Sequence, residues 1–260
     1  MAPMSTDEPQ DGAPWFQTAF EAPYLTLYRH RTDEAARKEV AWAAVHLRRL
    51  LGGGSDDLRL LDLGCGNGRH ARALADHGFV ITGLDYSQDL LVAAEAKDAS
   101  RPIRYLRGDM RDLPLDGPFD AVTSFFTSFG YFADEADDRR VLAEVARVLS
   151  PTGVYLLDFL QAEQVRRSLV PESVEERDGW RLEQQRRITP DGRRVEKTVH
   201  MTASDGSTRR YTESVRLYEL ADFRPMLDDV GMTVSEVYGS LAGDDFAPDS
   251  PRLVLLCRPS

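Results

Sequence analysis

Apolar and polar positions recur along the chain with two different periods, which predict strands and helices in turn. Short apolar runs bounded by glycine, such as LRLLDLG at 58–64, are typical of strands that are buried on both faces. The stretches between these runs repeat their apolar residues every three or four positions, as one face of a helix does. Because the two patterns alternate, they predict a parallel sheet with helices on both of its faces. The expected strands are 58–64, 79–87, 103–110, 119–126 and 154–160, and the expected helices are 40–51, 70–78, 89–99 and 138–153.

The pattern changes after the fifth expected strand. Between about 174 and 217, short and largely alternating segments are joined by TPDG and ASDGS, which are favourable sequences for tight turns. These segments predict an antiparallel sheet inserted into the α/β pattern. A helix at 221–231 and two strands at 232–240 and 251–259 then resume the first pattern. We expect the insert to roof a pocket beyond the carboxyl edge of the main sheet, since it follows the carboxyl end of a parallel strand.

Composition limits the class of protein. The chain has 260 residues, of which 42% are hydrophobic, enough for one large α/β domain with an insertion. Its formal net charge of −11 predicts no overall attraction to nucleic acid or to anionic membranes. Cys65 and Cys257 are too few for a disulfide scaffold and match no zinc spacing, so no metal is expected. Residues 1–14 are polar, acidic and proline-rich, and are expected to form a disordered tail rather than a signal peptide. We therefore expect a soluble, cytoplasmic monomer or homodimer.

A glycine-rich turn follows the first expected strand, in the segment LLDLGCGNGRHARAL. Gly64, Gly66 and Gly68 indicate a strand-to-helix turn whose backbone a ligand can approach closely, although a tight turn that binds nothing can carry the same glycines. Two acids favour a ligand. Asp85 ends the next expected strand, roughly 20 residues on, where a carboxylate can accept from ribose hydroxyls. Asp109 follows the third strand, on the same edge of the sheet.

This turn does not match the fingerprint of dinucleotide-binding proteins. The fingerprint G-x-G-x-x-G requires a glycine where Arg69 stands, whereas the text from Asp62 to Gly68 reads D-x-G-x-G-x-G. An acid at the entrance would repel a pyrophosphate but would suit the ammonium group of a methionine moiety. The turn therefore favours S-adenosylmethionine over NAD as the ligand.

Five segments within residues 40–160 carry a family resemblance: LDLGCGNGRHARAL, GLDYS, GDMRDLP, FDAVTSFFTSFGYF and LSPTGVYLLDF. Together they resemble the motif series of class I, Rossmann-like S-adenosylmethionine-dependent methyltransferases. The resemblance implies an α/β fold with a seven-stranded mixed sheet in the order 3-2-1-4-5-7-6 and helices on both faces. The insert resembles the small-molecule subgroup in which extra strands after strand five cover the active site. We expect residues 15–160 and 218–260 to form the cofactor-binding domain and residues 161–217 to form an inserted lid.

The resemblance also implies roles for individual residues. Asp62 and Gly64 would contact the methionine ammonium, directly or through the backbone, and Asp85 would hold the ribose. The other implied cofactor contacts are Cys65, Gly66 and Gly68 in the turn, where the last two glycines leave room for the cofactor, then Tyr86 beside the adenine, Asp109 at the adenine amine and the Met110 N–H at the ring.

The segment SFFTSFGYF after the fourth expected strand argues against three known chemistries. It lacks the Asn-Pro-Pro-Tyr type of segment expected in enzymes that methylate exocyclic DNA amines, and the Pro-Cys pair of cytosine C5 enzymes. No acid ends the strand, as one does in metal-dependent catechol-type enzymes. Its aromatic residues instead predict a wall that excludes water, with Phe125 and Phe126 facing the ligand. Packing in the core is the alternative for the other aromatic residues.

Two regions supply candidates for the acceptor side. The resemblance implies that an aromatic N-terminal segment folds over the cofactor, with Tyr24, Tyr28 and Arg31 closing the site and Arg31 pairing with the methionine carboxylate. Packing of this segment on the sheet is the alternative. The candidate catalytic residues are His200 and Tyr211 of the insert, together with Tyr28. A solvated strand face accounts for His200 and Tyr211 as well.

The insert is rich in basic residues, and three functions stay open. The first is methyl transfer from S-adenosylmethionine to nitrogen or oxygen of a small molecule. The second is modification of tRNA or another RNA docked on the basic insert. The third is a cofactor-binding module without turnover, because no catalytic base is evident. A solvated sheet surface is the simpler explanation of the basic residues, which are Arg181, Arg186, Arg187, Arg193, Arg194, Lys197, Arg209, Arg210 and Arg216.

Overall fold

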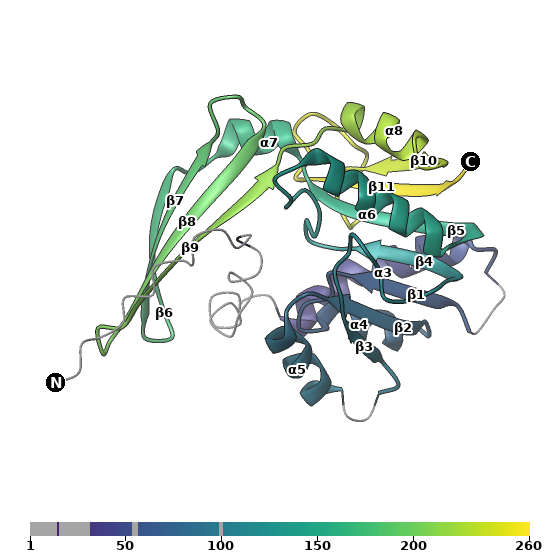
Figure 1. The fold of residues 1–260 in the computed structure, drawn as a ribbon, viewed down its shortest axis with the longest axis horizontal. Helices are drawn as coiled ribbons and strands as arrows, with labels where there is room; N and C mark the ends of the chain where they lie inside the picture. The colour runs from purple at the N-terminus through teal and green to yellow at the C-terminus, as the bar shows by residue number, and fades with distance from the viewer. Residues whose placement is uncertain (1–14, 16–31, 54–56, 99–100) are drawn as a thin grey trace.

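The computed structural model describes residues 15, 32–53, 57–98 and 101–260, so the expected tail at 1–14 lies outside the described residues. Its main sheet has seven strands, which lie in the order β10-β11-β5-β4-β1-β2-β3 (Figure 1). They are β1 (Arg59–Leu63), β2 (Val80–Asp85), β3 (Arg104–Arg107), β4 (Phe119–Ser124), β5 (Leu149–Leu160), β10 (Met232–Tyr238) and β11 (Arg252–Pro259). Only β11 runs antiparallel to its neighbours β5 and β10, and the other described pairs of this sheet are parallel. The predicted fold and strand order are confirmed.

Helices cover both faces of this sheet, and each face has its own apolar core. The helices are α3 (Asp33–Leu50), α4 (Arg69–Asp76), α5 (Gln88–Lys97), α6 (Glu135–Val148) and α8 (Leu220–Asp228). On β1, Leu60 packs in the core that holds residues of α3 and α4, whereas Leu61 and Leu63 pack with residues of α6 and α8. The apolar run of the sequence is therefore a strand buried on both faces. In the described part of the chain, no helix is long and apolar enough to cross a membrane.

Two helix boundaries differ from the sequence-based expectation. Helix α3 already begins at Asp33, because the hydroxyl of Thr32 accepts from the Ala35 N–H at 3.2 Å and caps the helix. Helix α6 ends at Val148 rather than at the proline-glycine pair further on. Pro151 disfavours the helical conformation at Ser150 directly before it, and Leu149 is already extended and begins β5.

The insert is a four-stranded antiparallel sheet in the order β6-β7-β8-β9. Its strands are β6 (Glu172–Arg177), β7 (Trp180–Ile188), β8 (Arg194–Ala203) and β9 (Thr208–Arg216), and the short helix α7 (Ala162–Ser168) leads from β5 into it. Figure 1 shows this sheet, coloured green, projecting from the main domain as an arm. The predicted antiparallel insert after strand five is confirmed.

Tight turns set the register of the insert. The Gly192 N–H donates to the Thr189 carbonyl at 2.8 Å, and the Gly206 N–H donates to the Ala203 carbonyl at 3.0 Å, at the two turns that the sequence predicted. A third turn joins β6 to β7 through Asp178 and Gly179, with φ of 52° and 80°. Two positive φ values in a two-residue loop match the right-handed twist of a hairpin. The Asp-Gly pair was therefore a turn signal that the sequence analysis did not use.

Candidate active site

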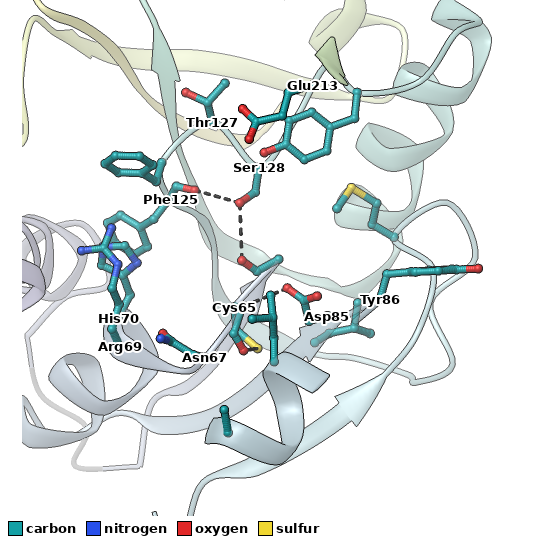
Figure 2. Close-up of a pocket in the computed structure, with 18 of the residues that line it drawn as sticks. Cys65, Asn67, Arg69, His70, Asp85, Tyr86, Phe125, Thr127, Ser128 and Glu213 are labelled. Atoms are coloured by element: carbon teal, nitrogen blue, oxygen red, sulfur yellow. Dashed lines mark hydrogen bonds between the residues drawn. The ribbon is translucent and has the colours of Figure 1, made fainter. Parts of the chain in front are cut away.

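A cavity of about 520 Å³ opens at the carboxyl ends of the central parallel strands (Figure 2). This volume is typical of a small-molecule site. We call one part of its lining the turn side, which comprises Gly64, Cys65, Gly66, Asn67, Asp85, Tyr86, Asp109 and Met110. We call the other part the insert side, which comprises Thr127, Ser128, Tyr131, Phe132, Glu213 and Val215. In Figure 2, Glu213 lies beside Thr127 and Ser128, across the cavity from Asn67 and Cys65.

The turn after β1 leaves its backbone bare on the turn side. Gly64 and Gly66 have φ of 75° and 54°, a region that suits glycine. A Cβ on Gly64 would lie 2.7 Å from the Cβ of Ser128, so a side chain there would collide with the insert side. The Asp85 carboxylate braces the turn by accepting from the Gly66 N–H at 2.7 Å and from the Ser87 N–H at 2.9 Å. Burial raises the pKa of Asp85, although these N–H groups oppose the shift.

Two residues that were expected at the cofactor lie behind this turn. Asp62 is 1% exposed and is not part of the cavity lining. Its Oδ1 accepts from the Thr123 hydroxyl at 3.1 Å, and its Oδ2 has no partner among the described residues. Burial raises the pKa of Asp62 to about 7. Gly68 is the N-cap residue of α4, and the Tyr105 hydroxyl fills the space that a Cβ would take. Gly68 thus makes room for Tyr105 and is not part of the cavity lining, and its role at the cofactor stays a prediction.

The carboxyl ends of β2 and β3 bring the expected adenine contacts to the turn side. Tyr86, Asp109 and Met110 all line the cavity, and the Arg107 guanidinium lies 5.7 Å from the centre of the Tyr86 ring. Asp109 Oδ2 pairs with Arg111 Nη2 at 2.6 Å. Burial acts to raise the pKa of Asp109, but the hydrogen bonds from Arg111 outweigh it and lower the pKa. An ionised carboxylate has lone pairs for further donors, so Asp109 can still accept from an amine.

The loop after β4 carries a strained backbone into the cavity. Phe126 and Thr127 have φ of 58° and 66°, which side-chain-bearing residues rarely adopt. Asp158 holds both residues, since its Oδ2 accepts from the Phe126 N–H at 2.7 Å and its carbonyl accepts from the Thr127 N–H at 2.9 Å. Arg252 Nε donates to Asp158 Oδ1 at 2.7 Å, and Arg252 Nη2 donates to the Thr127 hydroxyl at 3.0 Å. Phe125 is buried and Phe126 is 38% exposed, and both line the cavity.

A buried histidine lies against this loop. His70 stacks on Phe125 with ring centres 4.4 Å apart, and its Nε2 lies 2.7 Å from Glu39 Oε2. Arg69 Nη1 reaches the same Glu39 oxygen at 3.0 Å. Burial lowers the pKa of His70 to about 4, so its ring is neutral near pH 7. Because the ionised Glu39 can only accept, Nε2 carries the proton of the neutral ring.

The insert reaches the cavity through the base of β9. Glu213 and Val215 line the cavity, and Lys197 of β8 lies opposite Glu213 with Nζ 3.7 Å from Oε2. Successive residues of a strand face opposite sides of a sheet, so His200 lies on the face away from Lys197 and Glu213. Tyr211 shares the face of Glu213 but lies further along β9. Neither His200 nor Tyr211 is part of the cavity lining, so the structure does not bring these two catalytic candidates to the site.

The remaining N-terminal candidates lie outside the described residues. Tyr24, Tyr28 and Arg31 therefore keep their expected roles only as predictions. Trp15 is described, and it lines the cavity. Its indole N–H donates to the Tyr131 carbonyl at 3.2 Å, and the two rings meet edge to face with centres 5.0 Å apart. An aromatic residue near the N-terminus thus contacts Tyr131 of the insert side.

Several lining residues escaped the sequence analysis. Thr127 and Ser128 lie in the aromatic segment after β4 and line the cavity, but the sequence predicted only Phe125 and Phe126 at the ligand. Glu213 stands two residues after Tyr211, so the alternation of β9 places the two on one face but does not show that this face meets the cavity. In the described part of the chain, no three His, Cys, Asp or Glu side chains are grouped so that they could hold a metal ion.

In the insert, four of the nine basic residues between Trp180 and Arg216 pair with acids, namely Arg181, Arg187, Lys197 and Arg216. Arg187 pairs with Glu196 at 2.7 Å, and Arg181 pairs with Glu183 at 2.9 Å. Arg194 instead donates to backbone carbonyls of the loop after β4. These contacts support the simpler explanation, a solvated sheet surface, over a docking face for RNA.

The residues of the turn side fit S-adenosylmethionine. The bare glycine turn, Asp85 at the end of β2 and Asp109 after β3 suit a methionine moiety, a ribose and an adenine, in that order. The strand order with an antiparallel seventh strand and this cavity define an S-adenosylmethionine-dependent methyltransferase. A family model described as a methyltransferase domain matches residues 60–153. The chain belongs to the class I S-adenosylmethionine-dependent methyltransferases, of the small-molecule type with an antiparallel insertion after strand five.

Three similar proteins illustrate the relationship. The cypemycin N-terminal methyltransferase of a Streptomyces species is 30% identical over 84% of this chain and 87% of its own length. The crystal structure of the sugar N-methyltransferase KedS8 from Streptoalloteichus sp. ATCC 53650 is 26% identical, with a TM-score of 0.70 over 100% of this chain and 99% of that one. The S-adenosylmethionine-bound structure of CalS10, an amino pentose methyltransferase from Micromonospora echinaspora, is 25% identical, with a TM-score of 0.67 over 91% and 96% of the two chains. S-adenosylmethionine is thus the cofactor of this chain.

Proposed function

We propose that this enzyme transfers the methyl group of S-adenosylmethionine to an amine nitrogen of a small molecule. The observation that carries the proposal is the Glu213 carboxylate on the insert side, across the cavity from the glycine turn (Figure 2). A carboxylate there attracts an ammonium group and can take a proton from it. Val215 and the rings of Tyr131 and Phe132 supply the apolar surroundings that a methylated amine needs.

The choice of nitrogen over oxygen rests first on charge, because the Glu213 carboxylate attracts a cationic amine and has no such attraction for a neutral hydroxyl. A neutral amine already has a free electron pair, whereas a hydroxyl needs a base to draw off its proton during attack. His70 is a weak base, because its pKa is about 4 and its Nε2 is engaged with Glu39. Relatives with assigned acceptors act on nitrogen, among them a peptide N-terminal methyltransferase, dTDP-amino sugar N,N-dimethyltransferases and glycine/sarcosine N-methyltransferases.

In the proposed reaction the amine electron pair forms a bond to the methyl carbon while the carbon–sulfur bond breaks and its electrons stay on sulfur. S-adenosylmethionine supplies the activated methyl group. The nitrogen loses one proton, which Glu213 accepts or passes to water. The chain's own work is to hold the reactants in line and to exclude water, since positioning alone supplies much of the acceleration of such a displacement.

Site assignments on the turn side are part of this proposal. Asp85 accepts from the ribose hydroxyls, Tyr86 packs beside the adenine, and Asp109 accepts from its amine. Asp62, from behind the turn, and Gly64 contact the methionine ammonium, directly or through the backbone. Residues 15–160 and 218–260 form the cofactor-binding domain, and residues 161–217 cover the acceptor.

A panel of acceptors with methyl-labelled cofactor tests this proposal. The amines are glycine, sarcosine, glucosamine and an alanine tripeptide, and each has a counterpart without the free amine: glycolate, N-acetylglycine, glucose and the N-acetylated tripeptide. We expect label on nitrogen of at least one amine and on none of the counterparts. Transfer to a hydroxyl counterpart at an equal rate would refute the assignment to nitrogen.

A matched pair of variants tests the role of Glu213. Glu213→Gln keeps the size of the side chain and removes its charge, so turnover of the accepted amine should fall by about 10² to 10⁴, as for loss of a general base. Glu183→Gln changes the same group on the other face of the insert and should leave turnover unchanged. Equal turnover in both variants would remove Glu213 from the mechanism.

A further inference from the structure

One insert arginine is hydrogen bonded to three consecutive carbonyls of the loop after β4. Arg194 donates from Nη1 to the Phe132 carbonyl at 2.9 Å, and from Nη2 to the carbonyls of Gly130 at 3.3 Å and Tyr131 at 3.2 Å. It also donates from Nε to the hydroxyl of Ser214 at 2.8 Å and from Nη2 to the Ser214 carbonyl at 2.9 Å. One guanidinium therefore joins β8, β9 and the loop.

Arg194 is not part of the cavity lining, but the residues beside its contacts are. On β9, Ser214 is held by Arg194 while its neighbours Glu213 and Val215 face the cavity, as the alternation of a strand requires. On the loop, the carbonyls of Tyr131 and Phe132 accept hydrogen bonds from Arg194, and both residues line the cavity. Arg194 thus binds the backbone of Tyr131 and Phe132 directly, and it binds Ser214, which stands between Glu213 and Val215 in the chain.

The Tyr131 carbonyl also links Arg194 to Trp15, near the N-terminus. The Tyr131 carbonyl accepts from both Arg194 Nη2 and the indole N–H of Trp15, each at 3.2 Å. Trp15 also lines the cavity. Backbone hydrogen bonds add to the junction, because the Arg216 N–H donates to the Gly130 carbonyl at 2.8 Å and the Leu217 N–H donates to the Arg193 carbonyl at 2.7 Å.

A planar guanidinium suits this place, because its five N–H groups lie in a fixed fork that can satisfy several acceptors at once. A lysine ammonium is a compact charge at the end of a flexible stem and cannot span acceptors on β9 and on the loop in the same way. The contacts on the turn side, at Gly66 and Asp85, involve none of the partners of Arg194.

We propose that Arg194 is a positioning residue that assembles the acceptor side of the cavity from three separate parts of the chain, and that it acts on the acceptor without touching it. The inference rests on the proposed function, in which the insert side holds the amine. Removing Arg194 therefore loosens Glu213, Tyr131 and Phe132 relative to one another and leaves the cofactor contacts in place.

The test compares Arg194→Met and Arg194→Lys with Arg210→Met, a matched change of an exposed arginine on the same face of the insert. The probe is the amine that the wild type methylates fastest in the acceptor panel. For Arg194→Met we expect the KM of that amine to rise at least tenfold, while the dissociation constant of S-adenosylhomocysteine changes less than threefold. Arg194→Lys should recover part of the loss, and Arg210→Met should behave as the wild type does.

A second readout needs no acceptor. Amide hydrogen exchange of Arg194→Met should increase in residues 126–134 and 211–217 and should stay as in the wild type in residues 60–90. If Arg194→Met does not fold, Arg194→Lys carries both measurements. An unchanged amine KM with unchanged exchange in the two segments would overturn the inference, and so would equal effects on amine and S-adenosylhomocysteine. Absence of wild-type turnover with every amine would instead contradict the proposed function, while the exchange measurement would still decide on Arg194.

Discussion

Replacing Asp158 by asparagine tests whether this carboxylate holds the strained loop beside the cavity. Asp158 is 1% exposed, and its two oxygens accept from the Phe126 N–H and from Arg252 Nε, each at 2.7 Å. Asparagine has a single acceptor oxygen and turns an NH₂ group toward one of these two donors. The variant therefore loses one hydrogen bond to a charged group and leaves a donor facing a donor.

The magnitude follows from that loss. A hydrogen bond involving a charged group contributes about 1.5–3 kcal/mol. Each positive φ at Phe126 and Thr127 costs on the order of 1–3 kcal/mol, so the loop keeps this conformation only while its hydrogen bonds hold it. We expect a loss of roughly 2 kcal/mol in the free energy of unfolding. For a chain of this size that loss corresponds to a fall of roughly 4–8 °C in Tm.

Urea denaturation followed by circular dichroism measures the change in unfolding free energy, with Asp116→Asn as the control. Asp116 is almost fully exposed and pairs with Arg147 at 3.3 Å, so its replacement should change stability by less than about 0.5 kcal/mol. If Asp158→Asn were as stable as this control, the carboxylate would not hold the loop and the strain argument would be refuted.

Three further predictions address single residues. Asp85→Ala should weaken S-adenosylhomocysteine binding by about 1–3 kcal/mol in calorimetry, since it strands the partners of the carboxylate, and unchanged affinity would contradict its place at the ribose. His200→Ala should leave kcat and KM within roughly twofold of the wild type, because His200 lies on the face of the insert away from Glu213, and a large loss would restore it as a catalytic candidate. Burial raises the pKa of Asp138 to about 6, above the ordinary value of an aspartate near 4, so the folded protein holds this proton up to a higher pH than the unfolded chain. Asp138 therefore contributes stability that is fully present below about pH 4 and is lost as the pH rises through 6. Asparagine does not titrate, so Asp138→Asn should gain stability relative to the wild type as the pH rises between those values, by up to roughly 3 kcal/mol. Denaturation series at several pH values measure this gain.

The sequence predicted the turn side of the site well, because its residues are close together in the chain. A strand, a bare turn and a helix follow one another from Leu60 onward, and the acids after the next two strands must meet at the same edge of a parallel sheet. Local pattern and topology therefore placed Asp85 and Asp109 beside the glycine turn.

The insert side could not be predicted as well, because it depends on register and on contacts between distant segments. Deciding between Glu213 and His200 requires knowing which face of β8 and β9 meets the cavity, and the alternation alone does not say this. The role of Arg194 depends on a loop more than sixty residues away in the chain, since its bond to Phe132 spans 62 positions. The close approach of Tyr105 to Gly68 could not be predicted for a similar reason, because Tyr105 comes from β3, further along the chain.

A crystal structure with S-adenosylhomocysteine and the preferred amine is the measurement that tests the central claim most directly. The account predicts the adenosyl group against Gly66, Asp85 and Asp109, and the amine nitrogen between the sulfur and the Glu213 carboxylate, in line with the position of the transferred methyl group. An amine bound on the outer face of the insert, or one whose nitrogen lies away from both Glu213 and the sulfur, would contradict the account.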